Sequence, residues 1–173
     1  MSLFDDESAE AVARDRDRRG GAGSRPAFHP VPDALAHLAG EWLVTRTVVD
    51  LGDGSEGRFA GTTVFSALPA PDEGGLLHQE SGTFTWRGVK RPAERTLRFL
   101  PGDEPGTARV EFADGRFFHG LDLRRGRHTV DHPCARDLYR GEFEVRAPDR
   151  WISRWRVGGP AKDLLLVTEY VRA

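Results

Sequence analysis

The chain of 173 residues has one cysteine, one methionine and two tyrosines, and neither sign of charge predominates. A single cysteine excludes an internal disulfide and a zinc site built from several thiolates. Twenty-five Lys and Arg residues are balanced by twenty-seven Asp and Glu residues. The sequence therefore has no surplus positive charge with which to hold a nucleic-acid backbone or an anionic membrane surface, and neither is expected as a partner.

Long apolar runs and an export signal are also missing. The longest aliphatic run is Leu164–Val167, far short of the roughly twenty residues that a membrane helix requires. The N-terminal sequence MSLFDDESAEAVARDRDRRGG has acidic residues where a signal peptide has basic residues and an apolar stretch. These features predict a cytoplasmic protein without a membrane segment.

Two common catalytic signatures do not occur. The sequence contains no G-x-S-x-G motif, and GGPAK at 158–162 lacks the spacing of a Walker phosphate loop. The glycines of GGPAK are typical of a tight turn before a final strand, although Lys162 could reach an anionic ligand from there. No cofactor is expected from these patterns.

The composition changes near residue 32. Residues 1–32 carry charges of both signs followed by GGAGSRP, a composition with too little apolar surface to offset the entropy of ordering. We therefore predict a disordered N-terminal tail over residues 1–32 and a single domain over residues 33–173. Asp33 is a suitable N-cap for a short helix over 34–39, and Gly40 is a suitable stop.

The remainder consists of short segments rich in β-branched and aromatic residues, separated by turn clusters such as LGDGSEG, PAPDEGG and PGDEPGT. The predicted strands span 40–50, 58–68, 75–87, 95–100, 108–112, 116–123, 127–132, 137–145, 150–157 and 163–172. Ten strands paired in sequence order would leave two exposed edge strands, and closing the sheet into a barrel removes them. The pattern therefore predicts an all-β fold, an antiparallel up-and-down barrel of about ten strands with a short N-terminal helix at one end. A two-sheet β-sandwich is the alternative.

Several stretches resemble a bacterial and fungal domain family of unknown function: LAGEW, DGRFFHGLDL, HPCARDLYRGEF and W…RWRVGGPAKD…TEY. The resemblance extends from Leu35 to Tyr170. More loosely, Gly40-Glu41-Trp42 after a short helix is similar to the opening of the calycin superfamily, which includes lipocalins and fatty-acid-binding proteins. That resemblance implies a Trp packed across one end of the barrel and a cupped small-molecule cavity. Fold alone selects no function, because barrels of this group also include enzymes and haem binders.

Three of the six histidines, the cysteine and a tyrosine fall within residues 114–143. Strand alternation places His119 with Phe117, Leu121 and Leu123 on one face, and Phe118 on the other. Consecutive pairing would bring four candidate catalytic residues together: His119, His132, Asp137 and Tyr139. A histidine oriented by the aspartate could act as a base, and the tyrosine could stabilise an oxyanion. A satisfied hydrogen-bond network that holds the strands in register is an alternative of equal weight.

The same alternation points a second group inward. An inward Arg46 and an inward Glu80 would need each other or a ligand, because an isolated buried charge is costly. The four tryptophans could form an apolar wall, although inward aromatic residues more often fill a core. The predicted ligand-binding residues are Trp42, Arg46, Glu80, Trp86, Trp151, Trp155 and Lys162.

These patterns predict a barrel that binds a small organic molecule of unknown identity. An alternative is an enzyme of the isomerase, cyclase or hydrolase kind, with a histidine base and Tyr139 or Arg46 stabilising charge. A third is a metal or haem protein with His119 or His132 as ligand. The spacing of His132 and Cys134 matches no zinc motif, so no metal site is assigned. A homodimer burying an outer sheet face is compatible with the pattern, but nothing specifies it.

Overall fold

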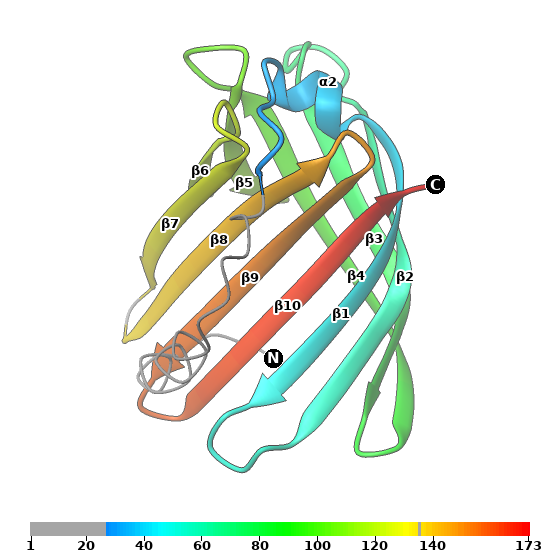
Figure 1. Ribbon diagram of the computed structural model, residues 1–173, viewed down its shortest axis with the longest axis vertical. Helices are drawn as coiled ribbons and strands as arrows, with labels where there is room; N and C mark the ends of the chain where they lie inside the picture. The colour runs from blue at the N-terminus through cyan, green and yellow to red at the C-terminus, as the bar shows by residue number, and fades with distance from the viewer. Residues whose placement is uncertain (1–26, 135) are drawn as a thin grey trace.

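The computed structural model describes residues 27–134 and 136–173, and these form a barrel of ten antiparallel strands (Figure 1). All ten strands belong to one sheet, ordered β6-β5-β4-β3-β2-β1-β10-β9-β8-β7. The barrel prediction is confirmed, and the sandwich alternative is wrong. The strands are β1 (Gly40–Asp50), β2 (Glu56–Ala67), β3 (Leu76–Trp86), β4 (Val89–Pro101), β5 (Thr107–Phe112), β6 (Phe117–Asp122), β7 (Arg127–Cys134), β8 (Asp137–Ala147), β9 (Arg150–Gly159) and β10 (Lys162–Arg172).

Strand β4 is longer than predicted, because it begins at Val89 instead of residue 95. The turn before it needs only Arg87 and Gly88, whose positive φ angles of 48° and 79° suit a tight hairpin. Pro92 lies within the added part and pairs with Thr83 of β3. Strand β5 pairs only with Leu97–Pro101, so the first half of β4 is an edge in the described structure. An edge strand tolerates proline, which lacks a backbone N–H.

The helix α2 (Ala34–Leu38) lies at one end of the barrel, the upper end in Figure 1. Asp33 caps it, as predicted, by accepting a hydrogen bond of 2.9 Å from Ala36 N. Trp42 is completely buried beneath the helix and donates from Nε1 to Leu38 O at 2.7 Å. Arg172 lies 4.2 Å above the Trp42 ring. No helix in the described part of the chain is long and apolar enough to cross a membrane.

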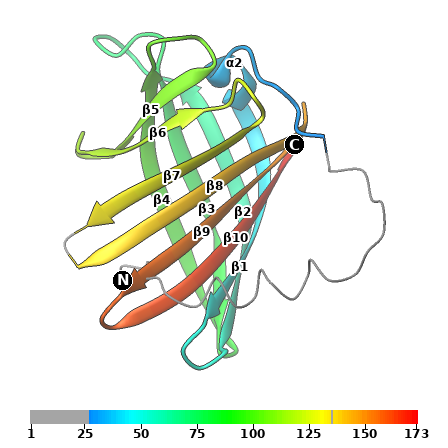
Figure 2. The ribbon, with the colours of Figure 1, turned by 60° about the vertical axis from the view of Figure 1, so that its left-hand side comes forward.

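The barrel closes between β6 and β7 without a backbone ladder among the described residues. These strands are joined by a short turn and lie next to each other in Figure 2. Side chains cross the seam instead: the His132 ring of β7 lies edge-on to the Phe118 ring of β6, with ring centroids 5.3 Å apart. Much of the histidine-rich stretch therefore forms the closure of the barrel.

Residues 27–32, which the composition assigned to the tail, pack along the barrel. His29 N donates to Val145 O at 2.8 Å, and Val31 N donates to Leu123 O at 3.0 Å. Val31 is only 2% exposed. The packed chain thus begins before the predicted boundary at residue 33, and the rest of the predicted tail, residues 1–26, lies outside the described residues.

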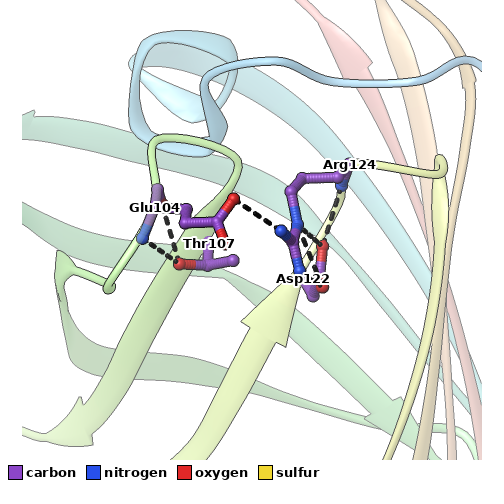
Figure 3. A network of polar contacts seen from close by, with 4 residues as sticks. All are labelled: Glu104, Thr107, Asp122 and Arg124. Carbon is purple, nitrogen blue, oxygen red and sulfur yellow. Dashed lines mark hydrogen bonds and ion pairs between the residues drawn. The ribbon is translucent and has the colours of Figure 1, made fainter.

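A polar network joins the loop between β4 and β5 to the turn between β6 and β7, close to α2 (Figure 3). Arg124 donates to Asp122 at 2.7 Å and to Glu104 at 2.6 Å. Thr107 Oγ1 donates to Glu104 O at 2.7 Å. The network is exposed, so it contributes little to the free energy of unfolding. Through the bond between Arg124 and Glu104, it links the β4–β5 loop to the β6–β7 turn at one end of the barrel.

Candidate functional site

A cavity of about 240 Å³ lies inside the barrel, in the half away from α2. Strand β1 shows where the cavity lies along the barrel. Trp42, near the start of β1, packs beneath the helix, and the residues of β1 that line the cavity, Arg46 and Val48, come later in the strand. Strands β2, β3, β4 and β10 supply the other walls. The lining residues are Arg46, Val48, Phe59, Glu80, Phe84, Ala93, Glu94, Arg95 and Leu166.

Arg46 and Glu80 meet in this cavity through two parallel hydrogen bonds. Arg46 Nη1 donates to Glu80 Oε1 and Nη2 donates to Oε2, both at 2.8 Å. Arg46 Nε donates to Thr168 Oγ1 at 2.7 Å, and Thr63 donates to Glu80 Oε2 at 3.4 Å. The sequence had placed both charges inward and required a partner for each. The structure brings them together as a bidentate pair, the strongest geometry that an arginine and a carboxylate adopt.

A second arginine, Arg95 of β4, lies on the other side of Glu80. Its Nη2 is 3.6 Å from Glu80 Oε2, which is beyond a good hydrogen bond. Its Nε is buried and has no hydrogen-bond partner among the described residues. The side chain as a whole is 35% exposed, whereas that of Glu80 is 3% exposed. Arg95 thus faces both the cavity and solvent.

These charges set the protonation states of the interior. Burial alone raises the pKa of Glu80, but Arg95 and the bonds from Arg46 outweigh it and lower the pKa to about 2. Burial would lower the pKa of Arg46, but hydrogen bonding to Glu80 and the nearby Tyr170 raise it above its usual value. Both members of the pair are therefore charged at neutral pH. Burial, with Arg95 nearby, lowers the pKa of His78 to about 3, so this imidazole is neutral.

His119 lies elsewhere in the barrel, in an aromatic cluster between β6, β8 and β9. Its ring centroid is 5.3 Å from those of Phe143 and Trp155. Its Nδ1 is 2.8 Å from Gly120 O, and because a carbonyl only accepts, Nδ1 carries the proton. Burial outweighs this bond and lowers the pKa of His119 to about 4.

The expected division of faces in β6 is changed by a bulge. The pairing of β5 with β6 shifts between Val110 and Glu111, so Phe118 is 4% exposed and Phe117 is 48% exposed. The prediction that put Phe117 with His119 and Phe118 on the opposite face is wrong at this point. The inward Phe118 stacks on Trp155 with a centroid separation of 5.3 Å and an interplanar angle of 13°.

Four further predicted site residues lie near this cluster or at the far end of the barrel. His132 contacts the Tyr139 ring edge-on, with centroids 5.5 Å apart. Burial lowers the pKa of His132 below its usual value. Asp137 accepts a hydrogen bond from Lys162 across the ends of β8 and β10. Asp137 was predicted to orient a histidine, and Lys162 to bind an anionic ligand. In the structure each of these side chains instead binds the other.

The four tryptophans are spread along the barrel. Trp42 and Trp151 meet edge-on under α2 with ring centroids 6.2 Å apart. Trp86 stacks beside Phe84 at the opposite end. Trp155 lies in the aromatic cluster of His119. Of the predicted ligand-binding residues, Arg46 and Glu80 line the cavity described above.

Sequence reasoning missed Arg95 and the two phenylalanines of the cavity wall, Phe59 and Phe84. A signal for Phe59 existed in the glycines around it. A Cβ on Gly82 would lie 2.7 Å from the Phe59 ring and 2.4 Å from Ala60 O. Glycine at this position in a strand therefore marks a close approach by a ring and a backbone. Nothing in the sequence indicated that Arg95 faces the interior, because the strand was predicted to begin at this residue instead of at Val89.

Among residues 27–134 and 136–173, no group of three or more His, Cys, Asp or Glu side chains is arranged to hold a metal ion. The Cys134 side chain lies outside the described part. Of the two histidines that were candidates for a metal or haem, His119 has its Nδ1 bonded to Gly120 O, and the ring of His132 packs edge-on against Phe118 and Tyr139.

Comparison with known proteins gives a family and a fold. A family model described as "Family of unknown function (DUF6314)" matches residues 38–172. No curated protein matches. An S-type phycobiliprotein lyase from Guillardia theta has the same fold, with a TM-score of 0.60 and 11% identity over 80% of this chain and 90% of that chain. A protein of unknown function of the DUF3598 family from Nostoc punctiforme matches with a TM-score of 0.46 and 11% sequence identity. The match covers 88% of this chain and 53% of that chain.

Proposed function

Because the chain belongs to the DUF6314 family, which brings no activity with it, we propose a function from the barrel interior: the protein binds a small organic molecule in the cavity beside Arg46, Glu80 and Arg95. One observation carries the proposal. The interior holds a cavity of about 240 Å³ at this point, bounded by Phe59, Phe84 and Leu166 and by the charged groups of Arg46, Glu80 and Arg95.

The walls of the cavity have the character of a small-molecule site. Phe59, Phe84 and Leu166 supply apolar surface, and a few charged groups converge from β1, β3 and β4. Apolar walls with a small number of fixed polar groups are typical of specific ligand sites. The volume is below the roughly 300–1,000 Å³ found for drug-sized ligands, so the geometry favours a smaller molecule.

Binding is better supported than acid–base catalysis. A general base must reach the substrate and have a pKa near the working pH. The pKa of His119 is lowered to about 4, and its ring is packed against Phe143 and Trp155. The two titratable groups buried in the cavity wall, Arg46 and Glu80, are held in their charged forms by each other. Such groups orient a ligand more readily than they exchange protons with it.

The test is a panel of small neutral, acidic and basic compounds, scored by the shift in thermal unfolding of the whole protein. Ala93 lines the cavity and is half-buried, so Ala93→Leu should fill part of the space and abolish the shift. Ala60 lies exposed on β2, and Ala60→Leu is the matched control that should respond like the wild type. A ligand at about a hundredfold its Kd should stabilise the protein by roughly 2.7 kcal/mol.

Two results would overturn the proposal. One is a panel in which no compound stabilises the wild type. The other is stabilisation that is equal in the wild type, Ala60→Leu and Ala93→Leu, since binding would then occur elsewhere. Should Ala93→Leu fail to fold, chemical-shift changes at Phe59, Phe84 and Ala93 of the wild type locate the bound compound directly.

A further inference from the structure

The charges around the cavity are unequal. Arg46 and Arg95 contribute two guanidinium groups, and Glu80 contributes one buried carboxylate. Both oxygens of Glu80 are already engaged by Arg46, and Oε2 also accepts from Thr63. Glu94 lines the outer lip of the cavity, but it is exposed on the opposite face of β4, where solvent screens it. The polar interior thus retains one positive charge.

Arg95 carries that excess charge. Its buried Nε has no acceptor among the described residues, and leaving a buried charged donor unpaired is costly. The neighbouring imidazole of His78 cannot compensate, because a pKa lowered to about 3 leaves it neutral. An anion from outside can compensate this charge at the accessible part of the side chain, which is 35% exposed.

The wall next to Arg95 is open to such an acceptor. Strand β5 joins β4 only from Leu97 onward, so the residues of β4 before it have a free edge in the described structure. Arg95 is the first inward residue of β4 beyond the end of that ladder, and its side chain is 35% exposed. A ligand that entered here would meet the guanidinium of Arg95 first and the rings of Phe59 and Phe84 behind it.

From this geometry we infer that the ligand of the cavity is a small aromatic carboxylate, whose acid group binds Arg95 and whose ring packs against Phe59 and Phe84. The inference rests on the proposed function and specifies its ligand class. A planar guanidinium offers pairs of parallel N–H donors that match the two oxygens of a carboxylate, and 35% of the Arg95 side chain is accessible to such a ligand. The ring stays between aromatic walls, where offset or edge-on contacts favour it.

The experiment compares acids with amides of the same shape. Benzoate and cinnamate, with benzamide and cinnamamide as their neutral isosteres, are titrated into the full-length protein and followed by calorimetry. In the wild type each acid should bind at least about tenfold more tightly than its amide, because a hydrogen bond to a charged group contributes more than a neutral one. Arg95→Gln should remove this preference.

Lys90→Gln is the matched control. Lys90 is exposed on the same strand and does not line the cavity, so its replacement removes one positive charge while the acid preference should remain. Independently of any variant, the Arg95 Nε–H resonance of the wild type should move when cinnamate is added and stay in place with cinnamamide. This second measurement applies even if Arg95→Gln does not fold.

The outcomes separate the inference from the function on which it rests. If amides bind in the cavity as tightly as acids, or if the acid preference survives Arg95→Gln, the ligand class is wrong while cavity binding stands. Equal loss of preference in Lys90→Gln and Arg95→Gln would show general electrostatic attraction and would also overturn the inference. If neither acids, amides nor the neutral compounds of the wider panel bind, both proposals fall.

Discussion

At the scale of single residues, the buried pair of Arg46 and Glu80 dominates the interior. Burying two charges is favourable only when their geometry compensates for the lost hydration. Here it does so through two bonds of 2.8 Å and the additional bonds to Thr168 and Thr63. The pair restrains both side chains, whereas the Nε of Arg95 has no hydrogen-bond partner among the described residues.

Glu80→Gln should destabilise the protein by roughly 3–5 kcal/mol, because it leaves Arg46 buried without a compensating charge. The double variant Arg46→Met/Glu80→Met should recover much of that loss, since no isolated charge remains. Urea unfolding followed by tryptophan fluorescence measures both. Glu56→Gln, which breaks an exposed pair with Arg58, is the control and should change stability by less than about 1 kcal/mol. Equal effects of Glu80→Gln and Glu56→Gln would contradict the assigned role of the pair.

At the scale of strands, inward glycines make room for rings. Gly82 of β3 faces Gly61 of β2 across the ladder, and the Phe59 ring lies over both. In the same way Gly141 of β8 lies under Trp155 of β9. Small residues at these positions allow aromatic rings to pack directly against the backbone of their own or a neighbouring strand.

Gly82→Ala should therefore lower stability by several kcal/mol, because its Cβ would lie 2.4 Å from the backbone oxygen of Ala60, an atom that cannot move away alone. Gly120→Ala is the control within a strand, since a Cβ there would have no atom within 4 Å. It should leave stability unchanged or raise it slightly. The midpoint of thermal unfolding distinguishes the two, and similar losses at both positions would refute the close-packing argument.

The strands themselves could be predicted, because turn chemistry and period-two alternation are local properties of the sequence. Alternation also placed Arg46 and Glu80 inward, and their meeting needed only three neighbouring strands in register. The cavity could not be predicted, because its height in the barrel depends on the stagger of five strands. Phe118 was misplaced because a bulge makes it an extra residue in β6, so that Phe118 and His119 are both buried.

At the scale of the whole molecule, the barrel keeps histidines buried in several places. The pKa of the half-buried His37 in α2 is lowered to about 4 by burial and by Arg172, that of His119 to about 4, and that of His78 to about 3. All three are neutral in the folded protein at neutral pH. Because they lie in three separate parts of the structure, their protonation should lower the free energy of unfolding of the whole domain.

The free energy of unfolding should consequently fall as the pH is lowered from about 6.5 toward 4. The folded pKa values are below the unfolded value of 6.5, so the unfolded chain takes up protons first and gains stability relative to the folded one. Stability is complete above the unfolded pKa and is lost on acidification, by an amount on the order of a few kcal/mol in total.

Urea unfolding at a series of pH values between 7 and 4 measures this slope. The carboxyl of Glu80, with its pKa lowered to about 2, adds to the loss only below its unfolded value of 4.5, so the upper part of the range reports on histidines. His119→Asn keeps a donor for Gly120 O without a group that titrates there, and it should make the slope shallower. A wild-type stability that stays constant between pH 7 and pH 5 would show that these histidines are not held neutral by the fold.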